Sequence, residues 1–168
     1  IPDDSIVICS FGDASLNHST AIGSINAACW SSFRTIPTPV LFVCEDNGIG
    51  ISVSTPRGWI ATVASRPGLR YVPANGLDIV EAFDAAEQAI DWVRRYRRPA
   101  MLHLDMVRLL GHAGSDVEQL YRSQEQIEAT EARDPLITTA RTVVNGGWMS
   151  RDEVLERYES IHESVMAE

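Results

Sequence analysis

The sequence predicts an α/β protein with a doubly wound, mostly parallel sheet and a helical C-terminal appendage. Two observations predict the sheet. Short, continuous apolar runs alternate with helical patterns over residues 1–110, and the order strand, helix, strand occurs twice. A third observation predicts the appendage, since residues 111–168 contain several helix-start signals and no strand pattern. At 168 residues, a single domain is favoured.

The first third of the chain contains the first strand–helix–strand unit. Residues 6–11 form an apolar run that stops at Gly12, a pattern typical of a strand buried on both faces. Apolar side chains then recur at three- and four-residue spacing over Ser19–Phe33, which predicts a helix. Residues 40–44 are a second buried strand. This order implies a right-handed crossover and parallel pairing.

The second unit is less regular at its start. Residues 48–56 resemble a loop, and 59–65 and 69–72 are a predicted short helix and a weak third strand. Asp78 then begins the clearest helix, with Glu81 as its capping-box partner. That helix ends in an arginine cluster at 94–98, which the helix dipole favours at a C-terminus. Residues 100–107 are the fourth strand.

The segment after residue 110 is predicted to be helical. Three helix starts are indicated, by Ser123 with Gln126, by Asp134 with Pro135, and by Ser150 with Glu153. We treat residues 111–168 as an extension of the same domain as residues 1–110.

Composition excludes several classes of function. The formal net charge is −9, which argues against non-specific binding of nucleic acid or of an anionic membrane. No apolar run approaches the roughly 20 residues that span a bilayer, so we expect a cytoplasmic protein. Cys9, Cys29 and Cys44 lack a CxxC spacing and are interpreted as reduced core thiols.

Residues that follow the strands are the candidates for ligand binding, because ligands of open parallel sheets bind at the carboxyl ends of the strands. Asp13 and Asn47 offer a carboxylate and an amide oxygen, and the backbone carbonyl near Ile49 could add a third oxygen. Mg²⁺ prefers oxygen ligands shared between protein and phosphate. The helix that starts near residues 17–19 directs free N–H groups toward Gly12, which suits a diphosphate.

Each of these residues also has a simpler interpretation. Asp13 could be only a helix cap, and Asn47-Gly48 is an ordinary turn signal. His112, in a glycine-flanked loop after the fourth strand, could be a surface residue or a functional base. Their recurrence at one end of three sheet elements favours a metal-bridged diphosphate site.

Two motifs resemble a known family. Gly12-Asp13-Ala14-Ser15, followed by Glu45-Asp46-Asn47-Gly48, resembles the thiamine diphosphate signature, in which a GDG leads to an NN pair. The stretch GHAGSD at 111–116, followed by YRS at 121–123 and RDP at 133–135, resembles the alpha subunit of 2-oxo acid dehydrogenase E1 components. The resemblance runs in register from about residue 6 to residue 136.

The resemblance implies a partial thiamine diphosphate-binding fold over residues 1–110, with an active-site loop and helical extension at 111–168. It implies Mg²⁺ ligands from the side chains of Asp13 and Asn47 and from the carbonyl of Ile49. The diphosphate would lie against three further residues, Gly12, Ala14 and Ser15. His112 would be a catalytic residue that contacts the cofactor and assists acyl transfer.

The implied activity is oxidative decarboxylation of a 2-oxo acid, of pyruvate or branched-chain type, with acyl transfer to a lipoyl-bearing acyltransferase. A beta subunit or beta half would supply the glutamate that activates the cofactor, and an oligomer is expected. Because the first strand begins almost at residue 1, we expect the C-terminal part of an alpha region, inactive alone. Ala14 and Asp46 depart from the family motif, and Ala113 replaces a serine that some members phosphorylate.

Two other functions compete with this one. A non-catalytic scaffold or assembly partner could retain the fold and bind nothing. A nucleotide-binding oxidoreductase lacks support because no GxGxxG follows the first strand.

Overall fold

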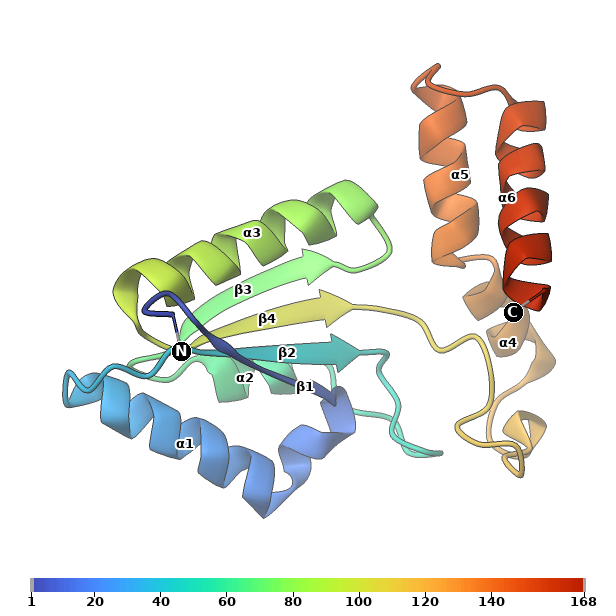
Figure 1. Ribbon diagram of the computed structural model, residues 1–168. Helices are drawn as coiled ribbons and strands as arrows, with labels where there is room; N and C mark the ends of the chain where they lie inside the picture. Colours follow the sequence, from blue (N-terminus) through green and yellow to red (C-terminus); the bar gives the residue numbers. More distant parts are fainter. Residues whose placement is uncertain (1, 168) are drawn as a thin grey trace.

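A computed structural model describes residues 2–167 and contains one four-stranded sheet. All pairings are parallel, and the strand order is β1-β2-β4-β3 (Figure 1). The strands are β1 (Val7–Gly12), β2 (Val40–Asp46), β3 (Arg70–Asn75) and β4 (Ala100–Asp105). The predicted α/β class with a parallel sheet is therefore confirmed.

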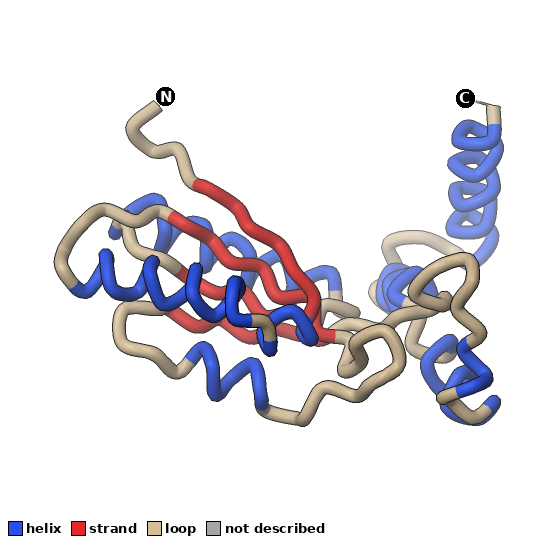
Figure 2. The backbone as a smooth tube through the Cα atoms, turned by 90° about the horizontal axis from the view of Figure 1, so that it is seen from below, coloured by secondary structure: helices blue, strands red, loops and turns tan. Residues whose placement is uncertain are grey.

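Helices cover both faces of this sheet (Figures 1 and 2). On one face lie α1 (Ser19–Phe33) and α2 (Trp59–Ala64), and on the other lies α3 (Ile79–Tyr96). Alternate residues of β2 point to opposite faces. Phe42 and Cys44 pack with α1 and α2, whereas Leu41 packs with α3. This alternation explains the continuous apolar runs, because a strand covered on both faces needs apolar residues at every position.

The prediction that the first strand is buried on both faces was wrong. Val7 and Ile8 are 59% and 60% exposed, and Cys9 is exposed as well. In the described part of the chain β1 pairs with β2 alone, so it forms an edge of the sheet. Cys9 is therefore not a core thiol, although Cys29 and Cys44 are buried as predicted.

The helix caps largely follow the sequence signals. Ser123 and Ser150 form capping boxes at the starts of α4 (Gln124–Glu131) and α6 (Arg151–Met166). At α3, however, the predicted box is incomplete. Asp78 accepts hydrogen bonds from two helix N–H groups, but the Glu81 carboxylate accepts instead from the backbone N–H of Asn75, at 2.8 Å.

Residues beyond 110 lie beside the carboxyl ends of the strands (Figure 1). The 3-10 helices η1 (Asp13–Asn17) and η2 (Glu118–Leu120) are the two shortest elements, and α5 (Pro135–Asn145) pairs with α6 in a hairpin. The hairpin is tied to the sheet layer by Thr138, whose hydroxyl donates to the carbonyl of Leu77 at 3.0 Å. The assignment of 111–168 to the same domain remains a prediction. Among residues 2–167, no helix is both long and apolar enough to cross a membrane.

Candidate functional site

Parallel pairing brings the predicted ligand residues to one edge of the sheet. In the register of β1 with β2, Gly12 lies opposite Glu45. Asp13 therefore follows β1 at the level where β2 ends in Asp46, the residue before Asn47. Two segments separated by about thirty residues in sequence thus begin their loops side by side.

Asp13 is the most deeply buried polar residue of this edge. It is 1% exposed, and its Oδ2 atom has no hydrogen-bond partner among residues 2–167. Asp13 lines a cavity of about 600 Å³ together with Ala14 and the loop from Gly50 to Pro56. A buried carboxylate oxygen without a partner is unfavourable, so native structures nearly always satisfy it by a protein group, water or an ion.

The same cavity contains an unpartnered donor. Trp59 lines this cavity, and its indole Nε1 is buried without an acceptor in the described residues. An unsatisfied acceptor and an unsatisfied donor on one cavity wall indicate a place built for a polar ligand.

The loop after β2 packs directly against Ala14, the residue after Asp13. A Cβ atom added at Gly50 would lie 3.2 Å from the Cβ of Ala14, so glycine allows the loop to approach η1 closely. The Asn47 side-chain oxygen accepts from the backbone N–H of Ile49 at 3.2 Å, which holds the turn. Ser52 and Ser54 line both the Asp13 cavity and a second one.

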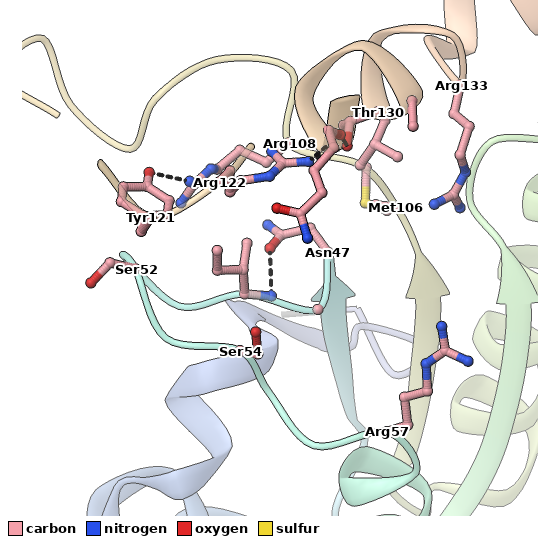
Figure 3. A pocket seen from close by; sticks show the side chains of 15 residues that line it. Asn47, Ser52, Ser54, Arg57, Met106, Arg108, Tyr121, Arg122, Thr130 and Arg133 are labelled. Carbon is pink, nitrogen blue, oxygen red and sulfur yellow. Dashed lines mark hydrogen bonds between the residues drawn. The ribbon is translucent and has the colours of Figure 1, made fainter. Parts of the chain in front are cut away.

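The second cavity, of about 460 Å³, is rich in arginine. Figure 3 shows Asn47 near Arg108 and Arg122, with Arg57 and Arg133 toward the other side. Three of these four guanidinium groups lie beside carboxylates, Arg108 and Arg122 beside Glu118 and Arg133 beside Asp105. Asn47 and Ile49 line this cavity rather than the Asp13 cavity, so the loop 48–54 separates the two.

Arg108 connects this loop to the loop that contains His112. Its Nη1 donates to the carbonyls of Gly50 and Ile51, both at 3.0 Å, and its Nη2 donates to the Tyr121 hydroxyl at 2.6 Å. The Tyr121 hydroxyl in turn donates to Asp116 at 2.6 Å. The result is one polar network that spans both loops.

Asp116 completes this network at the His112 end. Its Oδ2 accepts from the backbone N–H of His112 at 2.7 Å. The hydrogen bonds from Tyr121 and from the His112 backbone, together with the Arg108 charge, lower the pKa of the Asp116 carboxyl. The pKa of Tyr121 is raised, first by burial and then by its hydrogen bond to Asp116.

Glu118 is a second buried carboxylate, 8% exposed. It pairs with Arg122 one helical turn away, and its Oε1 lies 3.6 Å from the Nη2 of Arg108. Arg122 also donates to the carbonyl of Gln126 and to the hydroxyl of Thr130. Glu118 is thus satisfied by two guanidinium groups.

The remaining predicted site residues are not brought into these cavities. His112 is exposed and lines neither cavity, and Ser15 is exposed and uses its carbonyl to accept from His18. Gly12 ends β1 with its backbone beside Glu45. The roles of Gly12, Ser15 and His112 toward a cofactor remain predictions.

Three carboxylates lie near the buried thiol of Cys44. Cys44 is fully buried, and the pKa of its thiol is raised to about 12, mainly by burial and further by the carboxylates of Asp46, Asp13 and Glu45. No three His, Cys, Asp or Glu side chains within residues 2–167 form a metal-binding group, but the predicted set uses only one carboxylate and two neutral oxygens.

Sequence reasoning missed three residues of this region. Arg108 also follows a predicted strand, and its position could have suggested it. Glu118 lies outside any motif. The Nε2 of His103 lies 2.9 Å from the Oδ2 of Asp46, and its Nδ1 lies 2.7 Å from the Tyr71 hydroxyl.

Comparison with known proteins gives one consistent result. The sequence profile of the family "Dehydrogenase E1 component" matches residues 2–168. The chain is 29% identical over 169 residues to the mitochondrial pyruvate dehydrogenase E1 component subunit alpha type I of Ascaris suum, covering 98% of this chain and 41% of that protein. It is 32% identical over 161 residues to the pyruvate dehydrogenase E1 component subunit alpha of Zymomonas mobilis, covering 92% and 43%. The chain therefore spans about two fifths of the length of these curated relatives.

Proposed function

This chain belongs to the dehydrogenase E1 component family, and on that premise we propose that it is the part of an alpha-type E1 component that binds the diphosphate and Mg²⁺ of thiamine diphosphate. The parent protein would decarboxylate a 2-oxo acid of pyruvate or branched-chain type oxidatively. It would then transfer the acyl group to a lipoyl carrier.

The unpartnered, buried carboxylate oxygen of Asp13 is the observation that carries the proposal. A scaffold that bound nothing would keep the cost of this group without compensation. The donor set also fits Mg²⁺, since Asp13, the Asn47 amide and the Ile49 carbonyl are all oxygen ligands.

The residues of this chain would bind and orient the cofactor. Asp13, Asn47 and Ile49 would hold the metal, and Ala14 at the cavity wall would leave space for the diphosphate. When bound, thiamine diphosphate supplies the electron sink that decarboxylation requires. His112 would act in acyl transfer, because an imidazole can accept or donate a proton near neutral pH.

The parent protein would depend on partners for the complete reaction. We propose that a beta subunit or beta half supplies the activating glutamate, that a lipoyl-bearing acyltransferase receives the acyl group, and that the protein is an oligomer. Nucleic acid and membranes are not proposed as partners, and a cytoplasmic location remains a prediction.

The proposal is tested by calorimetric titration of thiamine diphosphate into the full-length assembled protein, with and without Mg²⁺. We expect binding only with the metal, and loss of that binding in Asp13→Ala, because the variant lacks the buried carboxylate. Asp91→Ala, which removes an exposed carboxylate on α3, is the matched control and should bind as the wild type does. Equal binding without Mg²⁺, or wild-type affinity in Asp13→Ala, would contradict the proposal.

The role of His112 is tested separately. In His112→Ala we expect thiamine diphosphate affinity close to that of the wild type and a fall in acyl transfer of about 100-fold or more, the range of a lost general acid or base. Transfer to a lipoyl carrier is measured with pyruvate and with branched-chain 2-oxo acids side by side. Parallel loss of binding and transfer would assign His112 to a structural role.

A further inference from the structure

A chain of hydrogen bonds crosses three strands beneath the candidate metal turn. The Tyr71 hydroxyl on β3 lies 2.7 Å from the Nδ1 of His103 on β4, and the Nε2 of His103 lies 2.9 Å from the Oδ2 of Asp46 on β2. The other oxygen of Asp46 accepts from the backbone N–H of Gly48 at 2.9 Å.

The chemistry of the three side chains fixes which group donates and which accepts in each of these hydrogen bonds. A carboxylate only accepts, so His103 must donate to Asp46 through Nε2. In the neutral imidazole Nδ1 is then the acceptor for the Tyr71 hydroxyl. With the Gly48 N–H as the last donor, the carboxylate of Asp46 has a fixed partner on each of its two oxygens.

The hydrogen bonds between Tyr71, His103 and Asp46 are largely buried and join residues of regular strands. The side chains of His103 and Asp46 are 16% and 22% exposed, and β2 and β4 pair directly with Cys44 opposite His103. Burial between strands limits competition by water for these hydrogen bonds. The strands therefore give a rigid base to Asp46, the residue immediately before Asn47.

Asp46 in turn fixes the turn that contains the candidate ligands. Its bond to Gly48 and the bond from Ile49 to Asn47 are successive side-chain-to-backbone bonds within residues 46–49. The Asn47 side chain and the Ile49 carbonyl are held in this turn.

We infer that Tyr71 and His103 are positioning residues that act through Asp46 to orient the turn 46–49 for its bound metal. This inference rests on the proposed function for the identity of the ligand. The ordering of the turn by His103 does not depend on it. Outer residues of this kind typically contribute about 10- to 100-fold to metal affinity.

The experiment compares His103→Leu with His103→Gln in the full-length assembled protein. Leucine removes both hydrogen bonds, whereas glutamine keeps an N–H donor near the position of Nε2. We expect Mg²⁺-dependent thiamine diphosphate affinity to fall about tenfold in His103→Leu and to be largely restored in His103→Gln. Tyr71→Phe, which removes only the outer bond, should have a smaller effect. His162→Leu, on exposed α6, is the control and should have none.

A second readout uses no cofactor. Hydrogen–deuterium exchange of the peptide that contains residues 46–50 should be faster in His103→Leu than in the wild type, His103→Gln or His162→Leu. Unchanged exchange in His103→Leu would overturn the inference, and so would equal loss of affinity in the leucine and glutamine variants. If the wild type binds no cofactor with Mg²⁺, the proposed function fails, and the exchange result alone decides whether His103 orders the turn.

Discussion

Asp13 and Glu118 are both buried carboxylates at the carboxyl edge of the sheet, but they differ in what surrounds them. Glu118 contacts two arginines, Arg122 and Arg108. One carboxylate oxygen of Asp13 has no partner in the described residues, and the Asp13 residue lines a cavity. The same functional group is thus satisfied in one place by the protein and left open in the other.

This difference distinguishes a carboxylate that stabilises the fold from one that is available to bind a ligand. A carboxylate that the chain satisfies itself holds two segments together, here the helical region after residue 117 and the loop that follows β4. A carboxylate that the chain leaves unsatisfied requires a cation or donor from elsewhere. Burial alone would have given both residues the same role.

The largest contrast is expected in unfolding experiments on the full-length assembled protein without cofactor. Glu118→Gln leaves the partly buried guanidinium group of Arg122 without its counter-charge and removes one of the two carboxylates near Arg108, so we expect a loss of about 2 kcal/mol. Asp13→Asn removes an unpaired buried charge and should leave the free energy of unfolding unchanged or slightly higher. Chemical denaturation of both variants measures this. A large loss in Asp13→Asn with none in Glu118→Gln would reverse the roles assigned to the two residues.

A smaller effect is expected from pH at Asp116. Because the folded protein lowers the pKa of this carboxyl, the ionised group stabilises the fold above the ordinary carboxyl pKa of about 4. That contribution is lost as the pH falls through the lowered pKa. The Tm difference between wild type and Asp116→Asn should therefore be full at neutral pH and shrink in acid. A difference that stays constant from neutral to acid pH would show that the Asp116 charge is not involved.

Local patterns predicted the framework well. The apolar runs at 40–44 and 100–107 became β2 and β4, and the signal at Asp78 marked the start of α3. That Asp13 and Asn47 reach the same edge of the sheet also followed from sequence, because parallel strands end at one edge.

What sequence could not predict depends on contacts between distant residues. The pairing of Glu118 with Arg108, and of Asp46 with His103, joins positions that share no periodic pattern. The exposure of the first strand depended on its place at the sheet edge, which its apolar composition does not reveal. His112, like Asp13, was predicted as a site residue because it follows a strand and matches a family motif. The structure places its loop outside both cavities.

The most direct test of the proposed function is the position of the metal ion that we expect at Asp13 and the turn after β2. Anomalous diffraction from crystals of the full-length assembled protein, grown with Mn²⁺ and thiamine diphosphate, locates the ion directly. We expect a peak bonded to side-chain oxygens of Asp13 and Asn47 and to the carbonyl of Ile49. A peak elsewhere, with the Oδ2 of Asp13 still unpartnered, would contradict it.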